Sequence, residues 1–287
     1  MQETGSAALF MRNIEPENTP QRESETVVMA SYFAPPGLTS DKPQYSSRSL
    51  SDKQIAAPAE LNSEIRASRW SFYAWTFLRE NGDGTITPNL GPSGQGGQYG
   101  ASQAGAILNY RITGNTDRGL SLFARGSTAL AQSGEEEVAI GAKVKPISQI
   151  PFSLHAERRF GNPSNRNRGV AIYVAGGTEP ISIVDGLKLE TYGQAGYVFD
   201  DRDSYFFDGS ATLQMKLVGS DRKRVSVGTG IWTGGQRGVA RLDIGPRLDI
   251  RFPLAGTAAR LSVDWRQRVA GNAEPGSGVA ITLSSGF

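Results

Sequence analysis

The sequence of 287 residues contains no cysteine and only one histidine, His155. The absence of cysteine excludes disulfides, thiolate metal sites and cysteine nucleophiles. A single imidazole excludes a histidine cluster around a metal, so we predict no metal site and no cofactor. The chain also lacks any run of about 18 apolar residues, the length that a transmembrane helix requires. A membrane-spanning form of this chain would therefore be built from strands.

A strong net charge is missing as well. The chain has 30 Lys and Arg against 28 Asp and Glu, and its basic residues are spread along its length, which argues against binding nucleic acid. What is abundant is glycine: 35 glycines and 15 prolines favour turns and strands over long helices. The hydrophobic content of 38% is low for a soluble protein with a core of this size but typical of strands in which every second side chain faces water.

The chain divides into two parts by composition. Residues 1–65 are rich in Pro, Ser, Glu and Gln without sustained alternation, which predicts a flexible or loosely ordered segment. Residues 66–287 are predicted to form one β-domain. The start lacks the basic and apolar pattern of a signal peptide. Three explanations stay open: a longer precursor, an earlier start codon, or a chain that is not exported.

From Arg66 onward the sequence contains about twelve amphipathic runs, each bounded by Gly, Asn, Asp or Pro. Runs of ten to sixteen residues are long for globular strands but suit strands tilted across a membrane. The predicted fold is all-β, an antiparallel transmembrane barrel of about twelve strands after an irregular N-terminal segment. The predicted strands span 66–80, 98–113, 118–131, 135–146, 151–160, 168–177, 186–199, 203–218, 222–233, 237–252, 258–270 and 276–287.

The last ten residues, GVAITLSSGF, alternate apolar with small or polar side chains and end on Phe287. This ending resembles the closing strand of bacterial outer-membrane β-barrels, which the barrel-assembly machinery recognises. The resemblance implies that Phe287 is a membrane-targeting residue and that the chain resides in the bacterial outer membrane. Its expected partners are then outer-membrane lipid, lipopolysaccharide and the assembly machinery.

The alternation alone does not show whether the polar or the apolar face of each strand points into the barrel. A soluble barrel of so many strands would have a lumen too wide for its apolar side chains to fill. Aromatic residues lie near strand ends, where a membrane barrel carries its aromatic girdles: Trp70, Tyr110, Phe160, Phe199, Tyr205 and Phe252. We therefore expect the polar faces to point inward, with a soluble β-sandwich as the alternative.

Charged residues alternate with apolar ones most clearly in the late strands. They could line the lumen as a neutralising network that plugs a narrow barrel, or as a track for an anionic sugar polymer. The lumen-lining candidates are Lys188, Glu190, Lys216, Arg224, Arg241, Asp243, Arg247, Asp249, Arg251, Arg260, Asp264, Arg266 and Arg268.

His155 shares one strand face with Ser153, Glu157 and Arg159, which raises the alternative of an outer-membrane lipid hydrolase. Residues two apart in a strand are separated by about 7 Å, too far for a direct hydrogen bond from serine to histidine. We therefore predict that the chain is not an enzyme and that His155 is a hydrogen-bonded residue of the lumen.

The phrases TGGQRGVARLDIGPRLDIRF and LSVDWRQRVAGNAEPGSG resemble the C-terminal barrel domain of outer-membrane proteins that export exopolysaccharide. These include the phage adsorption protein A type and the outer-membrane component of cellulose synthase, in which helical repeats absent from this sequence precede the barrel. The resemblance implies a porin-like or export-associated barrel for polysaccharide, with synthesis and export proteins as partners. The alternative is a structural or phage-receptor barrel that exposes the loop near Gly91–Gly97.

Overall fold

The computed structural model describes residues 68–80, 102–113, 119–130, 136–147, 150–161, 169–199, 204–220 and 223–287. Twelve antiparallel strands form one closed barrel within these ranges, which confirms the predicted fold class. No helix long and apolar enough to cross a membrane occurs among these residues. The predicted N-terminal segment 1–65 and the loop at Gly91–Gly97 lie outside them. The strands are β1 (Trp70–Arg79), β2 (Gln103–Arg111), β3 (Gly119–Ala129), β4 (Glu136–Lys145), β5 (Phe152–Gly161), β6 (Gly169–Val184), β7 (Leu187–Phe199), β8 (Ser204–Gly219), β9 (Arg224–Gln236), β10 (Val239–Leu254), β11 (Thr257–Gly271) and β12 (Gly278–Gly286).

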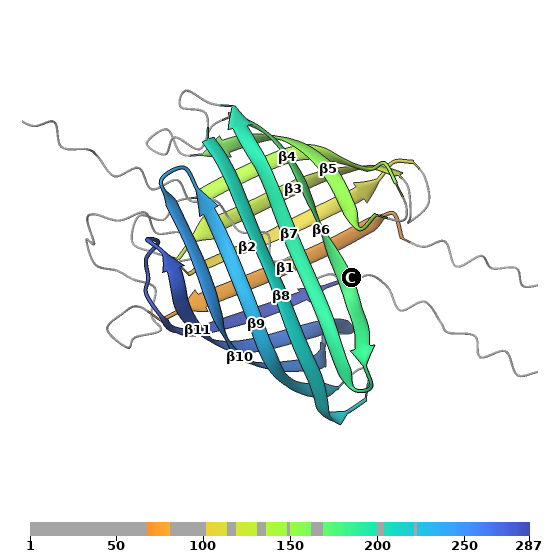
Figure 1. The fold of residues 1–287 in the computed structure, drawn as a ribbon. Coiled ribbons are helices and arrows are strands. Elements are labelled where there is room, and N and C mark those ends of the chain that lie inside the picture. The colour runs from red at the N-terminus through yellow and green to blue at the C-terminus, as the bar shows by residue number, and fades with distance from the viewer. Residues whose placement is uncertain are drawn as a thin grey trace, which may run out of the picture.

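The barrel is closed by pairing between its first and last strands. In Figure 1 the orange β1 runs beside the dark blue end of the chain, and the two strands pair in antiparallel register. Phe287 also pairs with β1: its amide donates to the Phe72 carbonyl at 3.0 Å, and the Phe72 amide donates to the Phe287 carbonyl at 3.1 Å. The two phenylalanine rings stack at 5.8 Å. Phe287 thus completes the closing ladder.

Two rims bound the barrel. The C-terminal rim contains Phe287 and the turns at Asp185–Gly186 and Ala255–Gly256, and the opposite rim contains the turn at Arg237–Gly238 and the segment Asn272–Ser277. The Asp185–Gly186 turn joins two strands directly and places Gly186 at a φ of +80°, which glycine adopts without strain.

One predicted strand end is wrong. The strand predicted over 168–177 ends at residue 177, but β6 continues to Val184. Proline cannot donate a ladder hydrogen bond, and the pairing with β7 shifts register between Thr178 and Ile181, which carries the strand past Pro180. Since β5 stops pairing with β6 at Gly176, the later strands project beyond β5 at the C-terminal rim.

The outer surface of the barrel is apolar. Exposed aromatic side chains lie near both rims, with Trp70 and Phe287 at the C-terminal rim and Phe160, Phe199 and Tyr205 near the opposite rim. This polarity is the reverse of a soluble barrel and is typical of a barrel in lipid. Between the rims the exposed side chains include Leu122, Ile140, Leu154, Ile172, Val174, Ile231, Ile244 and Leu283.

Large aromatic side chains inside the barrel lie opposite glycines on neighbouring strands. Trp75 pairs with Gly105, and Phe123 pairs with Gly141. A Cβ atom at Gly105 would lie 2.5 Å from the Trp75 indole, and one at Gly141 would lie 2.6 Å from the Phe123 ring. The absence of a side chain therefore lets each ring lie across the neighbouring strand, which fills the interior.

This packing generates a prediction for Gly105. Gly105→Val should force the Trp75 indole out of its position and destabilise the folded barrel by about 1–3 kcal/mol. Gly126→Val is the matched control, because a Cβ at Gly126 meets nothing within 4 Å. Urea-induced unfolding in lipid vesicles measures both free energies. Equal stability of the two variants would contradict the packing described for Trp75.

Candidate functional site in the barrel interior

The interior is filled by paired charges. In the part of the chain that the structure describes, the buried arginines and the buried carboxylates are equal in number, seven of each. Burying a charge without a partner costs several kcal/mol, and every one of these groups except Asp208 forms an ion pair with another described residue. The arginines are Arg79, Arg125, Arg159, Arg241, Arg247, Arg260 and Arg266, and the acids are Glu137, Glu157, Glu190, Asp208, Asp243, Asp249 and Asp264.

One group of charges spans β3 to β6. The Arg125 guanidinium donates to Glu137 and, at 2.9 Å, to Glu157. Arg159 donates to Glu157 at 2.6 Å, and the Tyr173 hydroxyl donates to the same carboxylate at 3.2 Å. Four strands are thereby joined through their inward side chains, in addition to the backbone ladder.

A second group lies at mid-height on β10 and β11. Arg247 donates two hydrogen bonds to Asp264, at 2.6 and 2.9 Å, and Arg266 donates to the same carboxylate at 3.2 Å. Both guanidinium groups also lie over the Trp232 ring, at 5.3 Å for Arg247 and 4.6 Å for Arg266. The indole face stabilises two cations that would otherwise repel each other.

A third group crosses the lumen toward the C-terminal rim. Arg260 on β11 donates to Asp249 on β10 and, at 2.6 Å, to Glu190 on β7. Three strands separate β7 from β11 in the barrel order, so the Glu190 contact crosses the interior. Arg251 lies 3.6 Å from the same Glu190 carboxylate. The interior is therefore bridged from wall to wall at this height.

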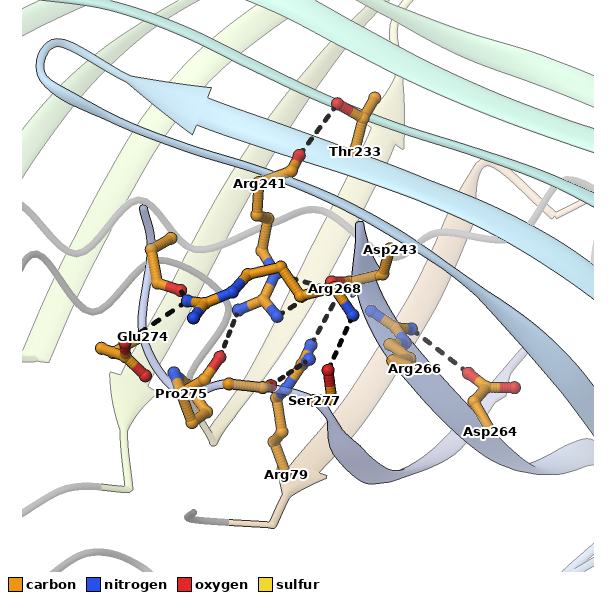
Figure 2. Close-up of polar contacts among 12 residues, drawn as sticks. Arg79, Thr233, Arg241, Asp243, Asp264, Arg266, Arg268, Glu274, Pro275 and Ser277 are labelled. Carbon is orange, nitrogen blue, oxygen red and sulfur yellow. Dashed lines mark hydrogen bonds and ion pairs between the residues drawn. The ribbon is translucent and has the colours of Figure 1, made fainter. Parts of the chain in front are cut away.

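A fourth group holds the segment Asn272–Ser277, here called the rim segment, at the opposite rim (Figure 2). Asp243 pairs with Arg79 and with Arg241, both at 3.0 Å. Arg79 then donates to the Gly276 carbonyl at 2.9 Å, and Arg241 donates to the Pro275 carbonyl at 3.1 Å. The guanidinium groups thus tie this loop to the barrel wall.

The rim segment is also anchored by packing and by a third arginine. Arg268 donates to the Ala273 carbonyl and pairs with Glu274 at 3.3 Å. Ala273 is fully buried and belongs to one apolar cluster with Tyr173, Val198 and Phe206, which lie on β6 to β8. The segment after β11 therefore reaches across the mouth toward the far wall of the barrel.

Two spaces adjoin the charged groups of the described residues. A cavity of about 30 Å³ lies between the second and third groups, among Tyr73, Thr212, Arg247 and Ser262, which is room for about one or two water molecules. A larger pocket of about 220 Å³ opens at the C-terminal rim beside Lys188, Lys216 and Arg224. The space at this rim is thus the larger of the two.

The predicted lumen-lining residues occupy three kinds of place. Glu190, Arg241, Asp243, Arg247, Asp249, Arg260, Asp264 and Arg266 are buried in the charged groups. Lys188, Lys216, Arg224 and Arg251 line the pocket at the C-terminal rim. Arg268, with a quarter of its side chain exposed, lies at the opposite rim.

His155 is surrounded by rings rather than by catalytic partners. Its imidazole stacks on Tyr173 at 4.6 Å and meets the Phe123 ring edge-on at 5.7 Å. Its Nδ1 atom is buried without a hydrogen-bond partner among the described residues, which differs from the hydrogen-bonded histidine we predicted. The neighbouring Glu157 carboxylate is held by Arg125, Arg159 and Tyr173. No group of His, Asp and Glu side chains suited to a metal occurs among the residues described.

Sequence reasoning omitted three residues of the network: Arg79, Arg125 and Glu137. Arg79 follows Tyr73, Trp75 and Phe77 on one face of β1, and all three rings point inward. A run of aromatic residues on one strand face is also typical of a lipid-facing side, so the sequence gives no signal that Arg79 points inward. For Arg125, the alternation of Phe123, Arg125 and Ser127 was the available signal.

Comparisons with known proteins find only distant similarities. No protein-family model and no curated protein matches the sequence. The KdgM porin is similar at 10% identity and a TM-score of 0.39, over 76% of this chain and 98% of that one. The beta domain of the Bordetella autotransporter BrkA has 11% identity and a TM-score of 0.42, over 77% and 99%. An outer membrane channel from Pseudomonas putida F1 has 12% identity and a TM-score of 0.37, over 81% and 99%.

The wall-to-wall contact of Arg260 generates a stability prediction. Arg260→Met leaves the Asp249 and Glu190 carboxylates buried without their main partner and should destabilise the barrel by about 3–5 kcal/mol. Arg268→Met, at the more exposed pair with Glu274, should cost less than about 1 kcal/mol. Urea-induced unfolding in vesicles compares them. A loss for Arg260→Met no greater than that for Arg268→Met would show that the crossing contact does not stabilise the fold.

Proposed function

We propose that this chain is a β-barrel of the bacterial outer membrane that provides a narrow, normally constricted passage for sugar polymers and catalyses no reaction. The observation that carries the proposal is the inverted polarity of the barrel, with seven buried arginines and seven buried carboxylates inside an apolar outer surface. In water such an outer surface would drive aggregation, whereas the hydrocarbon core of a bilayer accommodates it. The aromatic side chains near both rims suit the two membrane interfaces.

The orientation is inferred from the turns. The strands meet in two-residue turns at Asp185–Gly186 and Ala255–Gly256 on the C-terminal rim, and outer-membrane barrels carry short turns on the periplasmic side. We therefore place the C-terminal rim on the periplasmic side and the rim segment on the outer side. Chain entry from the periplasm would begin at the wider pocket.

The passage is supported by the charged column on β10. Ionisable side chains occur from Arg241 through Arg247 to Arg251 on its inward face, so polar groups extend along the height of the interior. Such groups can exchange hydrogen bonds with the hydroxyls of a sugar. At rest the column is occupied by its own ion pairs and the outer mouth is covered by the rim segment, so transport requires that this segment moves.

A second candidate is a non-conducting surface barrel, such as a receptor. The small central cavity of about 30 Å³ favours it, because a barrel filled by its own side chains needs no cargo. Conductance separates the two candidates.

We expect wild-type protein in planar bilayers to show little steady conductance. Replacing the group that ties the rim segment, with Arg79→Gln, Arg241→Gln and Asp243→Asn together, removes Asp243 along with both of its arginine partners and should raise the conductance several-fold. Arg237→Gln, in the exposed turn of the same rim, is the control and should behave as wild type. A silent triple variant whose insertion is verified by heat-modifiable migration would reject the passage in favour of the surface barrel.

Phe287 gives a separate test of targeting. Phe287→Ala should reduce assembly several-fold in vesicles that contain the barrel-assembly machinery, measured as the heat-modifiable band. The loss of ring stacking on Phe72 should cost only about 1 kcal/mol, so spontaneous folding in detergent should change little. Phe252→Ala, an aromatic residue near the same rim, is the control. Equal assembly of both variants would remove the targeting role.

A further inference from the structure

The pocket at the C-terminal rim has an unusual lining. Four cationic side chains surround its volume of about 220 Å³, namely Lys188, Lys216, Arg224 and Arg251, against the single acidic side chain Glu190. We call this pocket the basic vestibule. It lies where the later strands project beyond β5, on the inner sides of β7 to β10.

The strand register places like charges opposite one another here. Arg251 is the direct partner of Arg224 on β9 and of Arg260 on β11. Like charges directly opposite destabilise a sheet, so a row of three arginines calls for compensating anions. Arg260 receives them from Asp249 and Glu190, whereas Arg251 reaches these two carboxylates only at 3.7 and 3.6 Å.

The remaining cations are not neutralised by the fold. Lys188, Lys216 and Arg224 form no ion pair with any carboxylate in the described ranges, and the Arg224 Nε atom is buried without a hydrogen-bond partner there. The fully buried interior of the described ranges carries equal numbers of arginines and acids, whereas four cations and one carboxylate line the vestibule, which therefore has a local surplus of positive charge. A surplus beside an open pocket is the electrostatic arrangement of an anion site.

We infer that the basic vestibule binds an acidic saccharide, with the sugar carboxylate held by Arg224 and Arg251 and by the ammonium group of Lys188. Guanidinium groups bind carboxylates through paired hydrogen bonds, which a lysine alone does not provide. Ser226 and Gln214 also line the pocket and supply neutral polar groups for sugar hydroxyls. The inference deepens the proposed function by naming the cargo as anionic, and its biological meaning rests on that function.

The test is isothermal titration calorimetry on the full chain folded in detergent micelles at low ionic strength. The probes are a trimer of galacturonate, the neutral maltotriose and inorganic phosphate. We expect the uronate trimer to bind, maltotriose to give no heat, and added salt to weaken the uronate binding. Arg224→Gln and Lys188→Gln should each weaken it about tenfold, since each removes one charge-assisted contact.

Lys223→Gln is the matched control, because Lys223 precedes Arg224 in the chain, carries the same charge and does not line the vestibule. An equal loss of affinity in Lys223→Gln, binding of maltotriose, or no binding of the uronate by folded protein would each overturn the site. Competition by phosphate as strong as that by the trimer would overturn the saccharide assignment. Because the assay needs no bilayer, silent bilayers together with uronate binding would reject the passage while the site stands.

Discussion

Closure of the sheet between β1 and β12 is the constraint on which every other feature depends. An open edge would leave backbone amides and carbonyls unpaired, and closure with the help of Phe287 removes both edges. Once the sheet is closed, the alternation of each strand sends every second side chain inward. The large number of inward polar groups then has to be satisfied within the barrel, because lipid offers no partner outside.

The paired interior is the consequence of that constraint. Guanidinium groups with several donors each suit this role, and Arg260 illustrates it by joining Asp249 to Glu190 across the lumen. Aromatic rings such as Trp75 occupy the space above Gly105 and leave the centre with little free volume. The barrel is thus stabilised twice, by its backbone ladder around the circumference and by side-chain contacts through the middle.

The charged network ends differently at the two rims, so the barrel is asymmetric along its axis. At the opposite rim, backbone carbonyls of Pro275 and Gly276 accept hydrogen bonds from Arg241 and Arg79, so a loop of the chain itself satisfies the cations. At the C-terminal rim, no group of the described residues accepts a hydrogen bond from the Arg224 Nε atom. These two ends fit the passage that we propose, in which an anionic chain would enter at the cationic C-terminal rim.

The sequence by itself determined the number of strands, their approximate ends and the placement of alternating charges on one face of β10 and β11, because a period of two is a local property of each strand. It failed at Pro180, where a register shift carries β6 onward, and at Arg79, where inward aromatic residues gave the wrong signal. Only the tertiary structure decided which charges meet. Arg79 and Asp243 are separated by 164 positions, and Arg260 and Glu190 by 70. Such pairs depend on the register of every intervening strand and on closure, which no local pattern encodes.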